Sequence, residues 1–133
     1  MKEHLIYTAG LIDGEGTITL SKTNASDKYR HPVVSVTSTS YELLEFLKDN
    51  FGGHISVQKV YKETHKQSWS WAVSNDAAIK MIEQIYPFIK EKRKGNRAKM
   101  IIEQYKKLTV RNGKYTETQK QSKLDFETAF LSS

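Results

Sequence analysis

Residues 5–14 form the segment that most constrains how this chain folds. They read Leu-Ile-Tyr-Thr-Ala-Gly-Leu-Ile-Asp-Gly, an apolar stretch rich in small residues. Gly14 and Gly16 are expected to end a helix here, because glycine breaks helices and readily adopts the conformation that follows them. Two acids, Asp13 and Glu15, stand at the expected end. Apolar residues cover most of the circumference, which predicts a widely buried helix; they are Leu5, Ile6, Ala9, Leu11 and Ile12.

Small residues also form a stripe along this helix. Gly10 and Gly14 are one helical turn apart, as are Ala9 and Asp13. A stripe of this kind lets a second helix backbone approach closely. The common alternative in a soluble protein is a contact within the same chain. If two copies of the chain pair through this stripe about a twofold axis, their acid pairs come together.

The rest of the sequence alternates between strand and helix patterns. Strands are predicted at 17–23, 32–39, 54–61 and 67–74, and helices at 41–50, 75–85, 96–107 and 116–131. Pro87 ends the third helix. The order αββαββα predicts an α+β fold, in which a four-stranded antiparallel saddle-shaped sheet carries helices on one face. We expect a single domain over 1–133, with a core at about 4–107 and a C-terminal helical extension over 108–133.

The composition excludes several classes of protein. The chain has no cysteine, so disulfides and thiolate metal sites are absent. No apolar run reaches the ~20 residues of a membrane span, and the first residues lack the layout of a secretory signal. We therefore expect no membrane partner and an intracellular protein, in the cytoplasm or an organelle matrix. The net charge of +6 favours a polyanionic partner, although a solvated basic surface is the alternative.

The two acids at the helix end are candidate ligands for a metal ion. Carboxylate oxygens suit Mg²⁺, which usually takes one or two of them together with waters and substrate phosphates. The peptide oxygen of Gly14 could add a further ligand at the negative end of the helix. The alternative is that Asp13 and Glu15 are simply turn residues, since Asp-Gly and Glu-Gly are common in turns.

Polar and basic residues supply candidates for nucleic-acid contact. The predicted strands place a polar set on one sheet face, which suits a nucleic-acid groove: Ser21, Thr23, Ser35, Thr37, Ser68 and Ser70. Between residues 90 and 99 there is a basic cluster that would make phosphate contacts, unless it is a solvated helix face: Lys90, Lys92, Arg93, Lys94, Arg97 and Lys99. Trp69 and Trp71 alternate along their strand, which favours core packing over base stacking.

The segment Thr8-Ala-Gly-Leu-Ile-Asp-Gly-Glu-Gly16 resembles the LAGLIDADG motif of homing endonucleases, of the type with one motif per chain. Thr8, Gly14 and Glu15 are its departures from the motif. Trp71-Ala-Val-Ser and Tyr86-Pro-Phe-Ile-Lys-Glu-Lys92 look like later landmarks of the family, and the predicted element order is the fold that the resemblance implies. The likeness weakens after about residue 105.

The resemblance implies a homodimer that cleaves double-stranded DNA at a long, near-palindromic site with Mg²⁺, for which Mn²⁺ or Ca²⁺ could substitute in binding. The motif's last acid maps onto Glu15 as metal ligand and catalytic residue, with the Gly14 carbonyl as companion. Asp13 maps onto the first motif acid and is a further catalytic candidate, with its main role in supporting the helix end and the interface. Ala9, Gly10, Asp13 and Gly14 would line the dimer axis.

Three basic residues and one serine complete the expected site. Lys92 aligns with a family lysine near the scissile phosphate and is a catalytic candidate. Lys94 is a weaker candidate in the same neighbourhood, and Arg97 would bind DNA. Ser38 aligns with a polar position that orders water in some members. Its side chain is short, so helix capping or a place on the sheet face is the alternative.

A second functional class stays open from the sequence. The same fold could serve an intron RNA maturase or a DNA-binding regulator that does not cut DNA, so intron RNA is a possible partner. A third interpretation is that the chain is part of a larger nuclease with two motifs. We expect a single protomer instead, because the chain begins shortly before the motif and ends after plausible helices. The target sequence, the host and the genetic context cannot be predicted from one sequence.

Overall fold

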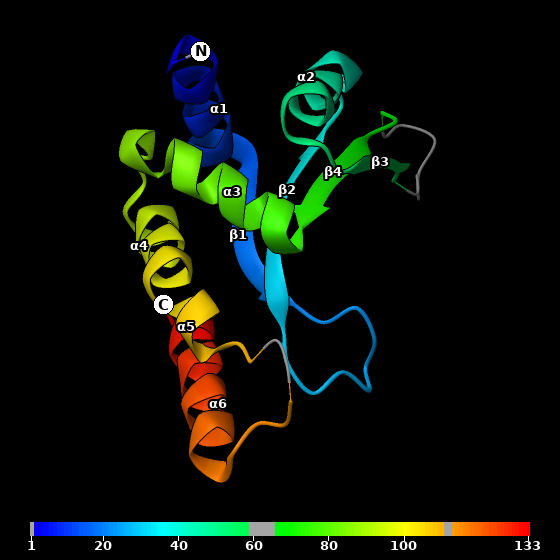
Figure 1. The fold of residues 1–133 in the computed structure, drawn as a ribbon. Coiled ribbons are helices and arrows are strands. Elements are labelled where there is room, and N and C mark those ends of the chain that lie inside the picture. The colour runs from blue at the N-terminus through cyan, green and yellow to red at the C-terminus, as the bar shows by residue number, and fades with distance from the viewer. Residues whose placement is uncertain (1, 59–65, 111–112) are drawn as a thin grey trace.

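Four antiparallel strands form one sheet in the order β1-β2-β4-β3 (Figure 1). The structure, a computed structural model, describes residues 2–58, 66–110 and 113–133. The α+β fold and the αββαββα core order are as predicted. Part of the predicted third strand, residues 59–61, lies outside the described residues. The strands are β1 (Gly16–Ser21), β2 (His31–Ser38), β3 (His54–Val57) and β4 (Trp69–Ser74).

The two faces of the sheet differ because side chains alternate along each strand. Helices α2 (Tyr41–Phe51) and α3 (Asn75–Ile85) pack on one face, and a short 3₁₀ turn, η1 (Tyr86–Phe88), follows α3. Trp71 is completely buried there and donates a hydrogen bond from Nε1 to the carbonyl of Gly52 (2.8 Å), so the core prediction for this residue is confirmed. Strand residues on the helix face are buried: Ile18, Leu20, Val34, Val36, Trp71 and Val73.

Helix α1 (Lys2–Glu15) contains the glycine-rich segment and is longer than predicted. Ala9 and Ile12 are fully buried. The prediction of burial on most sides is wrong for the single chain, because Ile6 and Tyr7 remain 48% and 52% exposed. Gly16 follows directly, and a Cβ on it would lie 2.8 Å from the Cα of Ile12, so only glycine fits this turn from helix to strand.

The basic cluster is helical from Lys92 onward, whereas the sequence predicted a helix only from about residue 96. Helix α4 spans Lys92–Met100 and continues through a π-helical turn, η2 (Ile101–Tyr105), into α5 (Lys106–Leu108). The carboxylate of Glu91 caps α4 by accepting hydrogen bonds from the backbone N–H groups of Arg93 (3.1 Å) and Lys94 (2.7 Å). Glu91 is therefore the N-cap residue that begins α4, within a basic segment whose sequence is typical of a linker.

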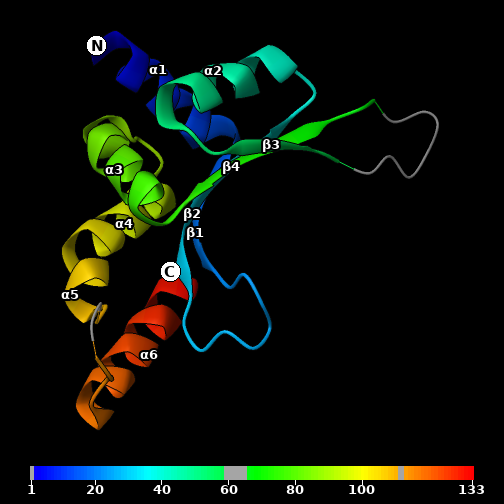
Figure 2. The same ribbon diagram turned by 45° about the vertical axis from the view of Figure 1, so that its right-hand side comes forward.

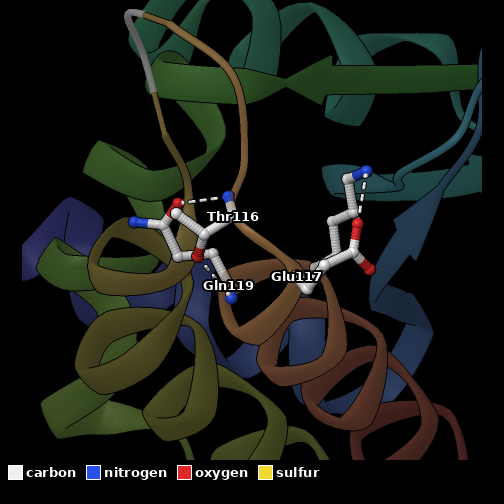
Figure 3. A network of polar contacts seen from close by, with 4 residues as sticks. Thr116, Glu117 and Gln119 are labelled. Atoms are coloured by element: carbon white, nitrogen blue, oxygen red, sulfur yellow. Dashed lines mark hydrogen bonds and ion pairs between the residues drawn. The ribbon is translucent and has the colours of Figure 1, made fainter.

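Helix α6 (Glu117–Leu131) is close to its predicted bounds, but its register is different. A reciprocal capping box starts it: Thr116 Oγ1 accepts from the Gln119 backbone N–H, and the Gln119 side chain accepts from that of Thr116 (Figure 3). Phe126 and Phe130 face the core, whereas the apolar residues chosen from the sequence point outward. Leu124 and Leu131 are 42% and 40% exposed, and Ala129 is also exposed.

Among the described helices, none has both the length and the apolar content to cross a membrane.

Candidate functional site

The end of α1 is joined to the start of α4 by four hydrogen bonds. The carboxylate of Asp13 accepts from the backbone N–H groups of Lys90 (2.9 Å) and Glu91 (3.0 Å). In return, Lys94 Nζ donates to the carbonyl oxygens of Ile12 and Asp13, each at 2.8 Å. The ammonium group thus satisfies two of the last carbonyls of α1, which have no partner within the helix. This joint fixes the two segments that carry the predicted catalytic residues.

Glu15 and Gly14 lie just beyond this joint, and both are exposed. Within the described part of the chain, the Glu15 carboxylate forms no hydrogen bond or ion pair, and no side chain donates to the Gly14 carbonyl. Since Lys94 occupies the carbonyls of Ile12 and Asp13, the carbonyl of Gly14 remains for another ligand. A free carboxylate beside a free carbonyl, at the negative end of a helix, is an oxygen donor set that suits Mg²⁺.

Lys92 is the first residue of α4 and is exposed. It lies two residues along the chain from Lys90, and Glu15 lies two residues from Asp13. Because Asp13 binds the backbone at Lys90, the structure brings Glu15 and Lys92 to the same joint. Both oxygens of Asp13 accept backbone hydrogen bonds, so this residue positions its neighbours and is not free to act on a substrate.

Two of the basic residues predicted to bind DNA serve the fold instead. Lys94 caps α1, as described above. Arg97 is only 8% exposed; its Nη1 donates to the carbonyl of Ile18 (3.1 Å), and its guanidinium lies 4.9 Å from the centre of the Phe130 ring. Burial, with a smaller contribution from Arg93, lowers the pKa of Arg97. Helical spacing turns these two side chains toward the fold, and DNA contact by either of them stays a prediction.

The outer members of the basic cluster surround an open hollow of about 820 Å³. Lys92, Asn96 and Lys99 follow one another at helical spacing and are exposed. Arg93 also lines the hollow, with its Nε donating to the carbonyl of Ser133 (2.9 Å). The exposed cationic groups of the basic cluster thus lie on the outer face of α4 and at Lys90 just before it.

The polar sheet face contains most of the strand residues predicted to meet nucleic acid. Thr37 pairs with Ser70, which pairs with Ser56 on the next strand, and Thr37 Oγ1 donates to Ser70 Oγ (3.2 Å). Ser21 and Ser35 lie on the same face, so the register predicted for these four residues is confirmed. Strand alternation also places residues here that the prediction omitted: Thr17, Thr19, His31, His54 and Ser56.

Three predicted DNA contacts lie elsewhere. Ser38 has the opposite parity to Thr37, so it is on the helix side, where its Oγ accepts from the backbone N–H of Ser40 (3.0 Å). Ser40 is the N-cap residue of α2, and α2 has no side-chain cap hydrogen bond, so helix capping by this serine pair is not borne out and DNA contact by Ser38 stays a prediction. Thr23 lies in the loop after β1 and is exposed, and Ser68 lies just before β4.

The stripe predicted for the dimer axis is partly exposed. A Cβ placed on Gly10 or Gly14 would meet no atom within 4 Å, so both glycines face open space. Ile6 and Tyr7 stand beside them on the exposed side of α1. Ala9 is completely buried within its own chain, so its prediction as an interface residue is wrong. The prediction grouped Ala9 with Asp13 because they are four residues apart. That row of residues lies next to the exposed row that contains Gly10 and Gly14.

A family model described as LAGLIDADG endonuclease matches residues 8–107. This range covers the motif helix, the sheet and the basic helix. The chain belongs to the LAGLIDADG endonuclease family. No match was found among curated proteins.

Solved structures of LAGLIDADG homing endonucleases share the fold. The homing endonuclease I-CvuI, in complex with the I-CreI target in the presence of Mg, is 19% identical with a TM-score of 0.63, over 92% of this chain and 73% of that one. I-CvuI with its own target and Ca is 13% identical with a TM-score of 0.61, over 96% of each chain. I-SmaMI bound to cleaved DNA is 20% identical with a TM-score of 0.65, over 97% of this chain but 43% of that one. At these identities the likeness establishes the fold.

Proposed function

We propose that this LAGLIDADG chain is a site-specific double-stranded DNA endonuclease that acts as a homodimer with Mg²⁺. The observation that carries the proposal is the joint at Asp13, whose carboxylate ties the end of α1, with its unpaired Glu15, to the segment that leads into α4, with its exposed Lys92. The homologues I-CvuI and I-SmaMI are bound to DNA in their structures. We propose that DNA is the partner of this chain as well.

The dimer would form through the exposed face of α1. Glycines at positions 10 and 14 permit close approach of a second α1, and Ile6 and Tyr7 would bury apolar surface in the contact. Asp13 stays next to this axis, holding α4 against α1. A twofold axis at the stripe would place two copies of Glu15 near one another, one for each DNA strand.

Each side chain then has a defined task. Glu15, with the Gly14 carbonyl, would hold the divalent ion, for which Mn²⁺ or Ca²⁺ could substitute in binding. When bound, this ion supplies Lewis-acid stabilisation of charge on the phosphate. Lys92 would donate to a phosphate oxygen as negative charge develops there. Polar residues of the sheet, including Ser35, Thr37 and Ser70, would meet base edges in the major groove.

The experiment is selection of cleaved sequences from a randomised DNA library, with Mg²⁺ and in parallel with EDTA. The proposal expects palindrome-like products in Mg²⁺, with half-sites of about one helical turn, ~10 bp, and none in EDTA. Cleavage without a defined site, or in EDTA, would contradict it. Binding to intron RNA with no DNA cleavage would instead indicate a maturase, and DNA binding alone a regulator.

A further inference from the structure

Two charged residues are buried on the inner face of α6. Lys123 is 1% exposed and Glu127 is 6% exposed, one helical turn apart. Burying a charge is costly unless it finds partners. The proposed cleavage site does not use either residue, so their partners indicate what the pair does.

Glu127 binds the loop that connects β1 to β2, residues 22–30. Its Oε2 accepts a hydrogen bond from the backbone N–H of Arg30 (3.1 Å), a residue 97 positions away in the sequence. Arg30 Nη1 in turn donates to the carbonyl of Leu20 on the opposite arm of the hairpin (3.4 Å). The loop is therefore fixed at its base, where it returns to the sheet.

Lys123 ties the same region to the segment after α5. Its Nζ donates to Thr109 Oγ1 and lies 4.0 Å from the centre of the Tyr105 ring and 6.0 Å from that of Tyr29. The Tyr29 ring packs on Tyr115 with centroids 4.8 Å apart. Tyr29 and Arg30 are adjacent in the chain, so both members of the buried pair act on one end of the loop.

The loop lies at the end of the sheet away from the start of α1 (Figures 1 and 2). Ser21 follows Gly16 by five residues, about 17 Å along an extended strand. At 3.4 Å per base pair the loop begins roughly five base pairs from the cleavage centre and therefore extends over the outer half of a ~10 bp half-site. The loop has its own ordered turn, because the Asp27 carboxylate accepts from the backbone N–H groups of Thr23 (3.1 Å) and Asn24 (3.0 Å). Lys22 and Lys28 are exposed on it.

We propose that Lys123 and Glu127 are positioning residues that hold the β1–β2 loop in place to read the outer base pairs of each DNA half-site. This inference rests on the proposed function and extends it, because it assigns site specificity to the C-terminal helix. The pair would act through the backbone of Arg30 and the ring of Tyr29, without touching DNA.

The test compares the base preferences of the wild-type chain with those of the double variant Lys123→Met/Glu127→Leu. Apolar replacement of buried charged groups by residues of similar size often preserves a fold, and here it removes the acceptor for the Arg30 N–H. Both proteins select cleaved sites from a library randomised across the half-site, in Mg²⁺. We expect discrimination at the outer positions to fall about tenfold, within the range carried by one base pair. Preferences near the dyad and the cleavage rate on the best site stay unchanged.

The matched control is Lys120→Met/Asp125→Leu, which removes one cation and one carboxylate from the outer side of α6 and should keep the wild-type profile. If the first double variant does not unfold cooperatively in urea, Glu127→Gln replaces it. A neutral acceptor is weaker than a carboxylate, so about a threefold loss at the same positions is expected. Retained outer preferences, or an equal loss at every position, would overturn the inference. Selection of no site by the wild-type chain would instead refute the proposed function.

Discussion

The partners of Lys94 illustrate how one residue's role depends on geometry that its sequence neighbours do not reveal. In the sequence, Lys94 belongs to a basic run and lies two residues from Lys92, so both lysines are expected to bind phosphate. In the structure, Lys94 Nζ binds the carbonyls of Ile12 and Asp13, while Lys92 is exposed. Its positive charge also lies at the negative end of α1. We therefore assign Lys94 to the stability of the α1–α4 joint.

Replacing Lys94 with methionine should lower the free energy of unfolding by about 1–3 kcal/mol, because two helix-terminal carbonyls lose a charged donor. Urea unfolding followed by circular dichroism measures this. Lys99→Met removes an exposed lysine from the same helix and should change stability by less than about 0.5 kcal/mol. Equal effects of the two substitutions would show that the cap contributes nothing.

Lys123 should make stability depend on pH. Burial lowers its pKa from 10.5, and the charge of Glu127 only partly opposes this shift. Below 10.5 and above the lowered pKa, the folded chain binds fewer protons than the unfolded chain, so stability rises with pH in that window. Tyr105 and Tyr29 face the ammonium from other elements. Burial raises the pKa of Tyr105, so its opposite effect begins only above about 10.

Urea unfolding of the wild-type chain at a series of pH values rising to about 10 should show this rise as the pH approaches 10.5. In Lys123→Met the slope of unfolding free energy against pH should be smaller. An identical slope in the two proteins would contradict an altered pKa at this position.

At the scale of the element, the face of α6 that packs on the core contains charged as well as apolar residues. Its inward face contains Lys123, Phe126, Glu127 and Phe130, at spacings of three, one and three residues. Two of the four are charged, which explains why apolar periodicity indicated the opposite face. Phe130 is fully buried, with the Arg97 guanidinium over its ring.

Phe130→Ala should lower the free energy of unfolding by about 3–5 kcal/mol, the usual cost of a cavity left by a buried phenylalanine. Leu131→Ala, on the neighbouring and partly exposed position, should change it by no more than about 0.5 kcal/mol. Chemical denaturation of both variants checks the assignment. A larger loss for Leu131 would restore the register predicted from the sequence.

The elements differ in how far the sequence predicts them, for physical reasons. Strand alternation places Thr37 and Ser70 on the polar face correctly, because a period of two leaves only one alternative register. The end of α1 is predictable to within one residue, since Gly16 follows its last residue, Glu15, although Gly14 lies inside the helix. The start of α4 and the partners of Arg97 are not, because they depend on contacts between residues far apart in the sequence, such as Arg97 with Ile18.

For the whole molecule, the exposed side of α1 is the surface through which we propose that two copies of the chain pair. Gly10 faces open space in the single chain, since a Cβ placed there would meet no atom within 4 Å. Ile6 and Tyr7 extend the same surface. A protein that remained monomeric would leave this apolar stripe in water, whereas pairing of two α1 helices would bury it.

Gly10→Leu separates these two cases. It should abolish the dimer while leaving the folded monomer intact, and it should stabilise the monomer slightly because leucine favours a helix over glycine by roughly 0.5–1 kcal/mol. Sedimentation equilibrium gives the mass, and Ala129→Leu is the control at an exposed position of α6. An unchanged dimer in Gly10→Leu would show that α1 is not the interface.

The substitution Glu15→Gln tests the central claim most directly. It keeps the size of the side chain but removes the negative charge proposed to hold the metal ion, with Glu45→Gln on the exposed surface of α2 as the matched control. On a DNA site selected by the wild-type chain, cleavage in Mg²⁺ should fall by more than about 100-fold in Glu15→Gln. Binding measured by fluorescence anisotropy should persist, and Glu45→Gln should cleave normally. Cleavage by Glu15→Gln at the wild-type rate would contradict the account.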